Sequence, residues 1–215
     1  MNIKKLVGLT LVASALGFIA NPAQATLMLS LNAGGGNQIS ITDNGAGDLD
    51  PTIGGIAWIG SLGTWIGNFT AGLSTAPGTD GIAVLDLASL NATSRRGGTL
   101  VITLTDNGFT SPNGVGLGAL TQVGGVTTGN VSFATLLSGS SVSNFGFNGG
   151  AFSGTNSTDV DVNGGFTLTQ IATLTNTGAG FTSFNIITTV PEPATLGLLG
   201  LGLVGLGFLR RRRVV

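Results

Sequence analysis

The sequence predicts an all-β protein, and three observations lead to that prediction. Apolar and polar residues alternate with a period of two in several short stretches, as in half-buried strands. Turn-forming pairs such as Asn44-Gly45 and Asn107-Gly108 separate these stretches. No stretch between residues 26 and 189 keeps the 3.6-residue period of a helix. Many short strands with regular turn signals favour an antiparallel β-sandwich with a jelly-roll-like arrangement.

The clearest strand signal lies at 99–106, where Leu100, Ile102 and Leu104 share one face and polar residues take most of the other. The stretch 166–176 repeats the pattern. Six shorter runs of the same kind are 27–31, 38–42, 65–71, 83–90, 130–137 and 181–189. Further turn signals lie at 33–36, 77–78, 113–114, 148–150 and 163–165. Thr-x-Thr pairs recur at 103/105, 167/169 and 173/175, so a β-solenoid is the alternative fold.

The first 25 residues have the three parts of a secretory signal peptide. Two lysines precede an apolar stretch at 6–20, and Ala23 and Ala25 form a small-residue cleavage site. The mature chain is therefore expected to begin at Thr26. Residues 26–189 then form one β-rich domain, which is long enough to enclose a hydrophobic core.

The charge of this predicted domain argues against nucleic acid as a partner. It contains eight aspartates, two arginines (Arg95 and Arg96) and no lysine, which gives a net charge of −6. A phosphate backbone needs a basic surface, and this composition does not supply one. The chain also has no cysteine, so the fold is expected to form without disulfides.

The residue inventory also argues against catalysis. The chain has no histidine or cysteine, so it lacks an imidazole base and a thiolate nucleophile. Only carboxylates remain for acid–base chemistry, and a hydrolase with paired aspartates is the alternative. Trp58 and Trp65 are expected to fill the core, although exposed they would stack on sugar rings. We therefore predict no enzyme, no catalytic residue and no cofactor other than calcium.

The candidate calcium site lies in the stretch from Asp43 to Asp50. Asp43, Asp48 and Asp50 provide three carboxylates within eight residues, and Gly45 and Gly47 allow backbone carbonyls to turn inward. Oxygen ligands of this kind suit calcium. The alternative is a polar hairpin loop in which the acids cap their own turns.

A second acidic stretch, 159–164, matches the opening of an EF-hand loop but not its end. Position twelve is Gln170 instead of the bidentate glutamate. We therefore expect a hairpin strand, with Val160 and Val162 facing inward and Asp159 and Asp161 facing water.

The C-terminal stretch 190–215 differs in character from the predicted domain. Pro191, Glu192 and Pro193 are followed by 16 residues without charge, 194–209. Four consecutive arginines come next, and they favour a cytoplasmic location for this end. These are Arg210, Arg211, Arg212 and Arg213. In their order and position, these features resemble the PEP-CTERM sorting tail of Gram-negative bacteria.

The resemblance implies export, membrane insertion through 194–209 and processing near Pro191–Pro193 by an exosortase-type enzyme. The protein would reside in the inner membrane transiently, and then at the cell surface or in the extracellular matrix. The resemblance also implies a structural or adhesive role in biofilm or exopolysaccharide, with extracellular polysaccharide as a partner. Two alternatives stay open: a calcium- or carbohydrate-binding β-module, and a plain tail anchor, although 16 apolar residues are short for a full span.

Overall fold

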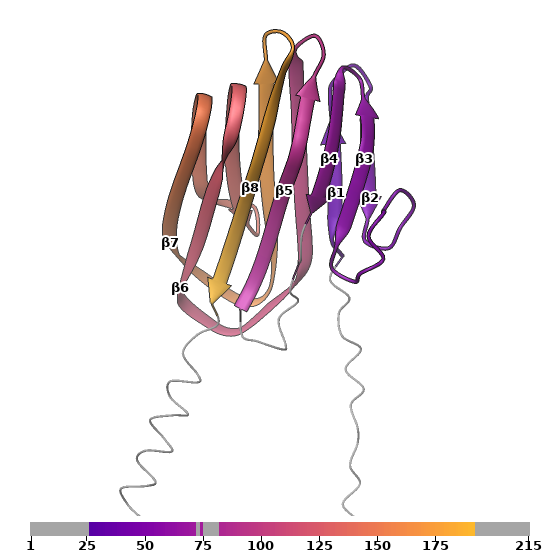
Figure 1. Cartoon of the computed structure of the whole chain (residues 1–215). Helices are drawn as coiled ribbons and strands as arrows, with labels where there is room; N and C mark the ends of the chain where they lie inside the picture. Colours follow the sequence, from indigo (N-terminus) through magenta and orange to yellow (C-terminus); the bar gives the residue numbers. More distant parts are fainter. Residues whose placement is uncertain (1–25, 72–73, 75–81, 192–215) are drawn as a thin grey trace, which may run out of the picture.

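The computed structural model describes residues 26–71, 74 and 82–191, so the predicted signal peptide and the turn at 77–78 lie outside the described residues. The described chain forms one antiparallel sheet system of eight strands (Figure 1). The strands are β1 (Met28–Asn32), β2 (Gln38–Thr42), β3 (Ile56–Leu62), β4 (Trp65–Ala71), β5 (Ile82–Ser94), β6 (Gly98–Leu137), β7 (Ser140–Asn176) and β8 (Gly180–Pro191).

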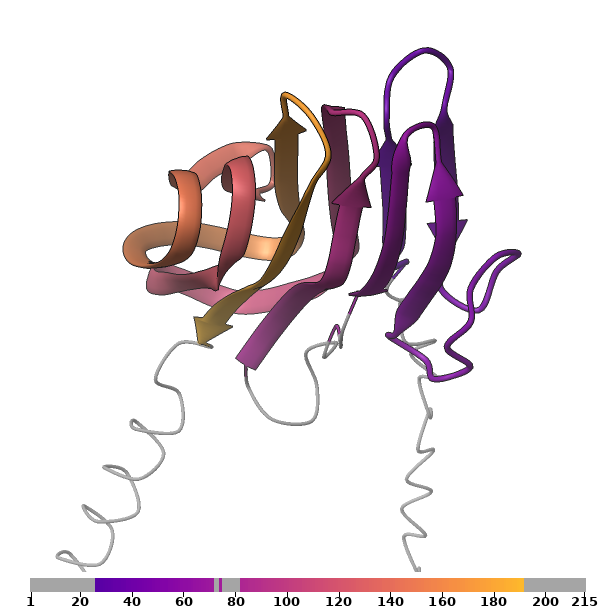
Figure 2. The same cartoon turned by 45° about the horizontal axis from the view of Figure 1, so that its top comes forward.

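The strand pairing divides the sheet into two layers, because the long strands β6 and β7 bend and pass from one layer to the other. Layer one contains β2, β1 and residues 98–106 and 130–137 of β6, with 166–176 and 140–148 of β7. Layer two contains β3, β4, β5, β8 and the middle parts of β6 and β7, 118–127 and 150–160. Figure 2 shows the sandwich tilted so that its top comes forward. The all-β antiparallel prediction is confirmed, and the body is a β-sandwich.

The core lies between the layers and follows the period-2 pattern of the sequence. Leu100, Ile102 and Leu104 are at most 1% exposed, which confirms the face predicted for 99–106. Leu85 and Leu87 of β5 are fully buried in layer two. Alternation therefore predicted which side of each strand faces the other layer, because successive side chains in a strand point to opposite faces.

Gln170 connects the two layers within this core. Its side chain is fully buried on β7, and Nε2 donates to the carbonyl oxygen of Leu85 at 2.8 Å and to the hydroxyl of Thr188 at 3.0 Å. Thr121 and Thr135 lie 3.2 and 3.4 Å from the same hydroxyl. This polar cluster is expected to favour one alignment of the layers, since a shift would leave buried polar groups without partners.

Seven of the eight predicted strand stretches fall within observed strands, and the eighth, 27–31, begins one residue before β1; the other differences concern what lies between the strands. The strand β3 was not predicted from the sequence, because its mixture of glycine, serine and apolar residues lacks strict alternation. The predicted turns at 107–108, 148–150 and 163–165 are bends inside β6 and β7. There the chain crosses between layers, so the turn-forming residues mark a change of direction instead of a strand end. All described strand pairs are antiparallel, and they do not form the stacked coils of the alternative β-solenoid.

The sandwich has two distinct ends. Thr26, beside Asn107, and Pro191, at the end of β8, lie at one end of the sandwich, the lower end in Figure 1, and we call this the terminal end. The opposite end carries the β5–β6 turn with Arg95 and Arg96, and we call it the distal end. A strand of about ten residues is roughly 33 Å long, which sets the separation of the two ends.

Candidate functional site

The predicted calcium loop lies at the terminal end, and its central carboxylate is occupied by backbone hydrogen bonds. Asp48 Oδ2 accepts from the backbone N–H of Asn44 at 2.9 Å. Its Oδ1 accepts from the N–H of Asp50 at 2.9 Å and from that of Ala57 at 3.0 Å. Asp48 therefore fastens the loop to the start of β3.

The two flanking acids act in the same way. Asp43 Oδ2 accepts from the N–H of Gly54 at 2.8 Å, and its Oδ1 accepts from the Asn44 side chain at 2.9 Å. Asp50 Oδ1 accepts from the N–H of Thr52 at 2.9 Å. Hydrogen bonds from the backbone and side chain of Thr52 lower the pKa of Asp50, because they favour its charged form. These contacts match the turn-capping interpretation of the loop.

The described residues contain no group of three or more acidic side chains placed to hold a metal ion. Asp43, Asp48 and Asp50 are close in sequence, but the loop directs their oxygens to different backbone N–H groups. Calcium binding by these residues stays a prediction.

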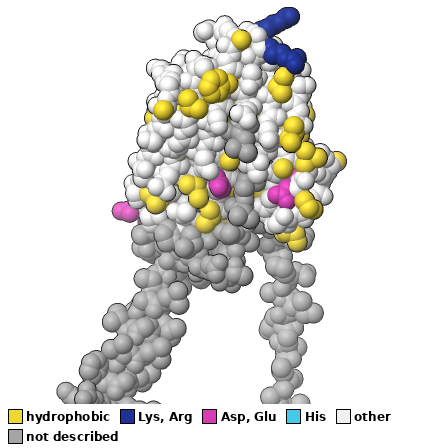
Figure 3. Space-filling view, in the orientation of Figure 1, with side chains coloured by type: hydrophobic (Ala, Val, Ile, Leu, Met, Phe, Trp, Pro, Cys, Tyr) yellow, Lys and Arg dark blue, Asp and Glu magenta, His cyan; other side chains and the backbone are white. Residues whose placement is uncertain are grey.

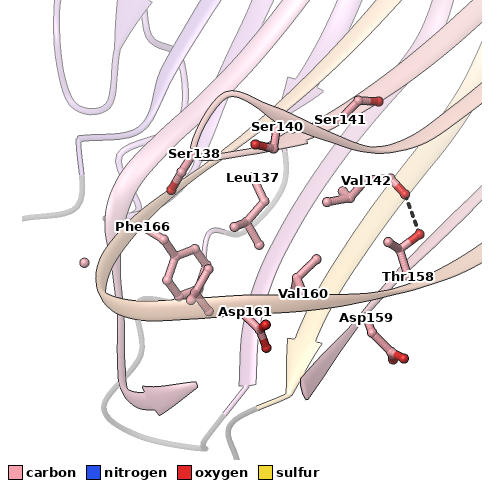
Figure 4. Close-up of a pocket in the computed structure, with 12 residues that line it drawn as sticks. Leu137, Ser138, Ser140, Ser141, Val142, Thr158, Asp159, Val160, Asp161 and Phe166 are labelled. Atoms are coloured by element: carbon pink, nitrogen blue, oxygen red, sulfur yellow. Dashed lines mark hydrogen bonds between the residues drawn. The ribbon is translucent and has the colours of Figure 1, made fainter. Parts of the chain in front are cut away.

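The second acidic stretch lines a pocket at the terminal end, and we call it the mouth pocket. It has a volume of about 420 Å³ and lies between residues 137–142 of layer one and 158–162 of layer two. Figure 4 shows Leu137, Val160 and Phe166 in its interior, with Asp159 and Asp161 along one edge. The lining consists of Leu137, Ser138, Ser140, Ser141, Val142, Thr158, Asp159, Val160, Asp161, Val162, Gly165 and Phe166.

Strand alternation gives the mouth pocket an apolar floor and a polar rim. Val162 is 6% exposed and Val160 is half-buried, whereas Asp159 and Asp161 are exposed, as the sequence predicted. The predicted hairpin at this point is wrong, because 163–165 continue within β7. The rim combines carboxylates with serine and threonine hydroxyls, which accept and donate hydrogen bonds.

Hydrogen bonds join the chain segments around the pocket. Thr158 donates its hydroxyl to the carbonyl oxygen of Val142 at 2.8 Å, and the Asn156 side chain donates to the same oxygen at 2.8 Å (Figure 4 shows the first bond). On the other side, the N–H of Ser138 donates to the carbonyl of Thr167 at 2.8 Å. These bonds connect the chain segments that line the pocket.

Of this pocket, the sequence singled out the stretch 159–164, with Asp159 and Asp161 facing water and Val160 and Val162 facing inward. The other lining residues come from separate stretches, 137–142 and 165–166, which alternation marks as ordinary strand or turn. Their grouping depends on the bends of β6 and β7, for which the sequence carries only glycine and asparagine signals. No local pattern identifies such a pocket.

One further acid, Asp106, is fully buried at the terminal end. Its Oδ1 accepts from the N–H of Gly108 at 2.9 Å, and Ser74 donates its hydroxyl to Oδ2. Both oxygens are thereby satisfied, and neither residue lines the mouth pocket. We assign Asp106 to holding Ser74 against the sandwich.

The predicted sorting motif begins inside the fold. Thr189 pairs with Val84 on one side and Leu120 on the other, and Pro191 pairs with Ile82 at the end of β8. Val190 is 2% exposed. The folded body thus runs directly into the motif without a linker. The remaining predicted sorting and cleavage residues lie outside the described residues: Ala23, Ala25, Glu192, Pro193, Arg210, Arg211, Arg212 and Arg213.

Within residues 26–71, 74 and 82–191, no helix is long and apolar enough to cross a membrane. The predicted membrane segment 194–209 lies outside that range.

Several solved structures share limited likeness with the chain. The carbohydrate-binding module TmCBM61 in complex with β-1,4-galactotriose is 8% identical over 53% of this chain and 84% of that chain, with a TM-score of 0.36. A module described as CBM36 in complex with calcium and xylotriose is 11% identical over 44% and 76%, with a TM-score of 0.25. A PA14 sugar-binding domain from an RTX adhesin is 14% identical over 41% and 45%, with a TM-score of 0.28. Likenesses of this extent carry no argument about a ligand.

The C-terminal region gives a specific match. Among curated proteins, none matches this chain. Residues 189–213, however, match the family of the PEP-CTERM protein-sorting motif, which confirms the resemblance drawn from Pro191, Glu192, Pro193 and the arginine cluster. The motif implies processing by an exosortase, and proteins that carry it are exported to the cell surface. The chain is therefore a β-sandwich protein that ends in a PEP-CTERM sorting motif.

Proposed function

We propose that this protein is an exported component of the bacterial cell surface or extracellular matrix, with a structural or adhesive role. The observation that carries the proposal is the sorting motif at residues 189–213. The β-sandwich is its functional part after processing, and the signal peptide and tail serve its delivery. The proposal includes passage through the inner membrane of a Gram-negative cell, and extracellular polysaccharide as the surrounding material.

The fold supports separate roles for the β-sandwich and the tail. β8 is paired on both sides along most of its length, and it ends at Pro191. Cleavage on the C-terminal side of Pro191 therefore leaves every described strand intact. The wrapping of β6 and β7 between two layers also supports the jelly-roll-like description, an all-β architecture that covers its strand edges in part.

We propose no enzymatic activity for the body. The chain has no histidine or cysteine, and the two acids of the mouth pocket are both exposed. An acid–base pair depends on environments that separate the two pKa values, which usually requires burial of at least one group.

Replacement of Pro191, Glu192 and Pro193 by alanine tests the proposal. We expect the variant to stay in the inner membrane with its tail, whereas the wild-type protein appears outside with a chain that ends near Pro191. Intact mass measurement in each cell fraction distinguishes the two forms. Replacement of the exposed residues Ser40 and Gln38 by alanine is the control, and it leaves export unchanged. Normal processing of the alanine variant would remove the sorting hypothesis.

A second candidate function is carbohydrate binding, and the mouth pocket is the observation that favours it. An apolar floor with Phe166 and a rim of hydroxyls and carboxylates suits a sugar, which has apolar C–H faces and many hydroxyls. Isothermal titration calorimetry with neutral oligosaccharides tests this function. Binding that is lost in Val160→Asp but kept in the control Thr155→Asp supports it, and an absence of heat with every oligosaccharide argues against it.

A further inference from the structure

The sheet edges of the sandwich differ in how well they are protected. On one side, β7 bulges at Val142, which has no opposite residue in β6, and the Val142 carbonyl oxygen accepts hydrogen bonds from Asn156 and Thr158. On the other side, layer one ends in the short β2 and layer two ends in β3. Within the described residues, β3 pairs with β4 and with no other strand. It contains no proline and no charged residue, which are common means of keeping an edge strand from pairing with another chain.

The loop before β3 covers only the first part of this edge. The N–H of Leu49 donates to the carbonyl oxygen of Ala57 at 2.9 Å, and the N–H of Ala57 donates to Asp48 at 3.0 Å. The backbone groups of Ala57 therefore face away from β4. Those of Ile59 and Ser61 face the same way, because successive residues of a strand direct their backbone groups to alternate sides. The described residues supply no hydrogen-bond partner to the backbone of Ile59 or Ser61.

Apolar side chains surround these free backbone groups. Ile59 is 63% exposed on the outer face of layer two, and Leu49 and Ile53 of the preceding loop are 60% and 81% exposed. Figure 3 shows several hydrophobic side chains along the right-hand side of the molecule, where β3 lies in Figure 1. On the core side, Trp58 is half-buried and stacks on Phe69, with ring centroids 5.7 Å apart. An exposed strand edge with apolar neighbours suits the addition of a further strand.

The free part of the edge is symmetric about Gly60, which lies between Ile59 and Ser61. When a second β3 pairs antiparallel with Gly60 opposite Gly60, Ile59 of each copy lies opposite Ser61 of the other and exchanges backbone hydrogen bonds with it. The two glycines form the closely spaced pair, with Cα atoms about 4.5 Å apart. A Cβ on Gly60 would lie 2.6 Å from Cζ2 of Trp58, so the Trp58 ring covers the glycine. The two Trp58 rings then meet over the glycine pair, and each lies beside Leu62 of the other copy.

The ends of the paired region also match. In this register Ala57 lies opposite Gly63 of the other copy, in the β3–β4 turn, so the loop bonded to Ala57 begins where the added strand ends. The same pairing sets the terminal end of each copy beside the distal end of the other. The acidic loop 43–50 then faces the turn that contains Thr64, whose carbonyl oxygen accepts from the N–H of Arg95 at 3.0 Å. Opposite charges at the two ends favour this antiparallel orientation.

A second copy suits this edge better than another segment of the same chain does. The described neighbours of the segments outside the described range, such as Thr26, Ile82 and Pro191, lie at the terminal end. Ile59 and Ser61 instead lead into the turn at the distal end. A second copy supplies a strand of the same length, with its glycine at the same position.

We propose that two copies of this protein pair through β3 into a symmetric dimer, in which layer two continues from one copy into the other. The contact is isologous, because the same edge serves both copies, and it stops at the dimer. Pairing also removes an edge that otherwise remains open to other chains. The inference concerns the body and does not depend on the proposed surface role.

Sedimentation velocity of the full chain in a mild detergent, over a wide range of concentration, tests the proposal. In detergent two tails are not held in one membrane, so the antiparallel arrangement is free to form. We expect a monomer–dimer equilibrium. Ile59→Pro removes an N–H that each copy donates to the other, and we expect dimerisation to weaken about tenfold or more. A proline is tolerated where the N–H of an edge strand faces outward, and circular dichroism verifies the fold. The control Ile59→Val keeps the N–H and leaves dimerisation unchanged.

Two charged variants test the register. Ile59→Lys with Ser61→Glu sets opposite charges across from each other in the proposed register, and we expect this variant to dimerise. Ile59→Lys with Ser61→Lys sets like charges across from each other, and we expect it to stay monomeric. Both positions are exposed, and the two variants differ only at residue 61. Equal association of the two variants overturns the proposal.

The fluorescence of Trp58 distinguishes pairing of the body from association of the tails. The chain has two tryptophans, and Trp65 is only 2% exposed, so pairing changes mainly the surroundings of Trp58. We expect the emission to shift to shorter wavelength as the concentration rises, because the Trp58 ring leaves water, and Trp58→Phe removes the shift. Association without this shift arises elsewhere in the chain and overturns the proposal. A wild-type protein that stays monomeric also overturns it, including one whose β3 edge is covered by another segment of its own chain.

Discussion

The two acidic stretches of the body, 43–50 and 159–161, look alike in composition and differ in what their carboxylates do. In the first, every acid accepts hydrogen bonds from the backbone of its own loop. In the second, the acids stand exposed at the edge of a pocket formed by two layers. The difference teaches that carboxylate spacing does not reveal whether an acidic stretch caps its own loop or lies at the rim of a pocket, because the surrounding strands decide this.

The largest expected effect that distinguishes the two stretches is on stability. Asp48→Ala removes the acceptor of three backbone N–H groups, and we expect the free energy of unfolding to fall by about 2 to 3 kcal/mol. Asp159→Ala removes an exposed acid and is expected to change it by less than about 0.5 kcal/mol. Urea unfolding of both variants measures the contrast. Equal losses in the two would erase the distinction drawn between the stretches.

The pH dependence of stability sharpens the comparison for Asp50. The pKa of Asp50 is lowered in the folded protein. The contribution of Asp50 to stability is therefore complete above its unfolded pKa of about 3.9, and it disappears as the pH falls through its folded pKa. The wild-type protein is therefore expected to exceed Asp50→Asn in stability at neutral pH, with the difference shrinking below pH ~4. Urea unfolding at a series of pH values measures it. A difference that is constant down to pH ~2 would contradict the assigned role.

Asp86 provides a third case, an acid that neither caps a loop nor lines the pocket. Burial raises its pKa, partly offset by a hydrogen bond with Asn185, and its Oδ1 has no partner among the described residues. The folded protein thus favours the neutral form of Asp86. The contribution of this group to stability is complete below its ordinary pKa and is lost as the pH rises through its raised pKa. Asp86→Asn is expected to gain no more than about 1 kcal/mol at neutral pH. A loss at pH 7 in urea unfolding would show that the charged form is the preferred one.

The smallest expected effect concerns calcium. Because the oxygens of Asp43, Asp48 and Asp50 already accept backbone hydrogen bonds, we expect the melting temperature to be the same in chelator and in millimolar calcium. Asp48→Ala serves as a reference that lacks the central carboxylate. An increase of the melting temperature with calcium, absent from that variant, would establish the calcium site predicted from the sequence.

Local patterns predicted much of the body. Alternation placed Leu100, Ile102 and Leu104 inside and Asp159 and Asp161 outside, because a strand directs successive side chains to opposite faces. The turn residues at 107–108 and 148–150 were recognised, but their role was not. Asparagine and glycine permit a sharp change of direction, and whether the strand ends there or bends into the other layer depends on its partners.

The sequence by itself determined that the body is all-β and antiparallel, and that the chain ends in a sorting motif, since periodicity and short motifs are local properties. Only the tertiary structure decided which residues share a site. The bends of β6 and β7 bring 137–142 beside 158–162, and they place the arginines and the pocket acids at opposite ends. The physical reason is that pairing between strands distant in sequence sets these positions, and no stretch of the chain contains that information alone.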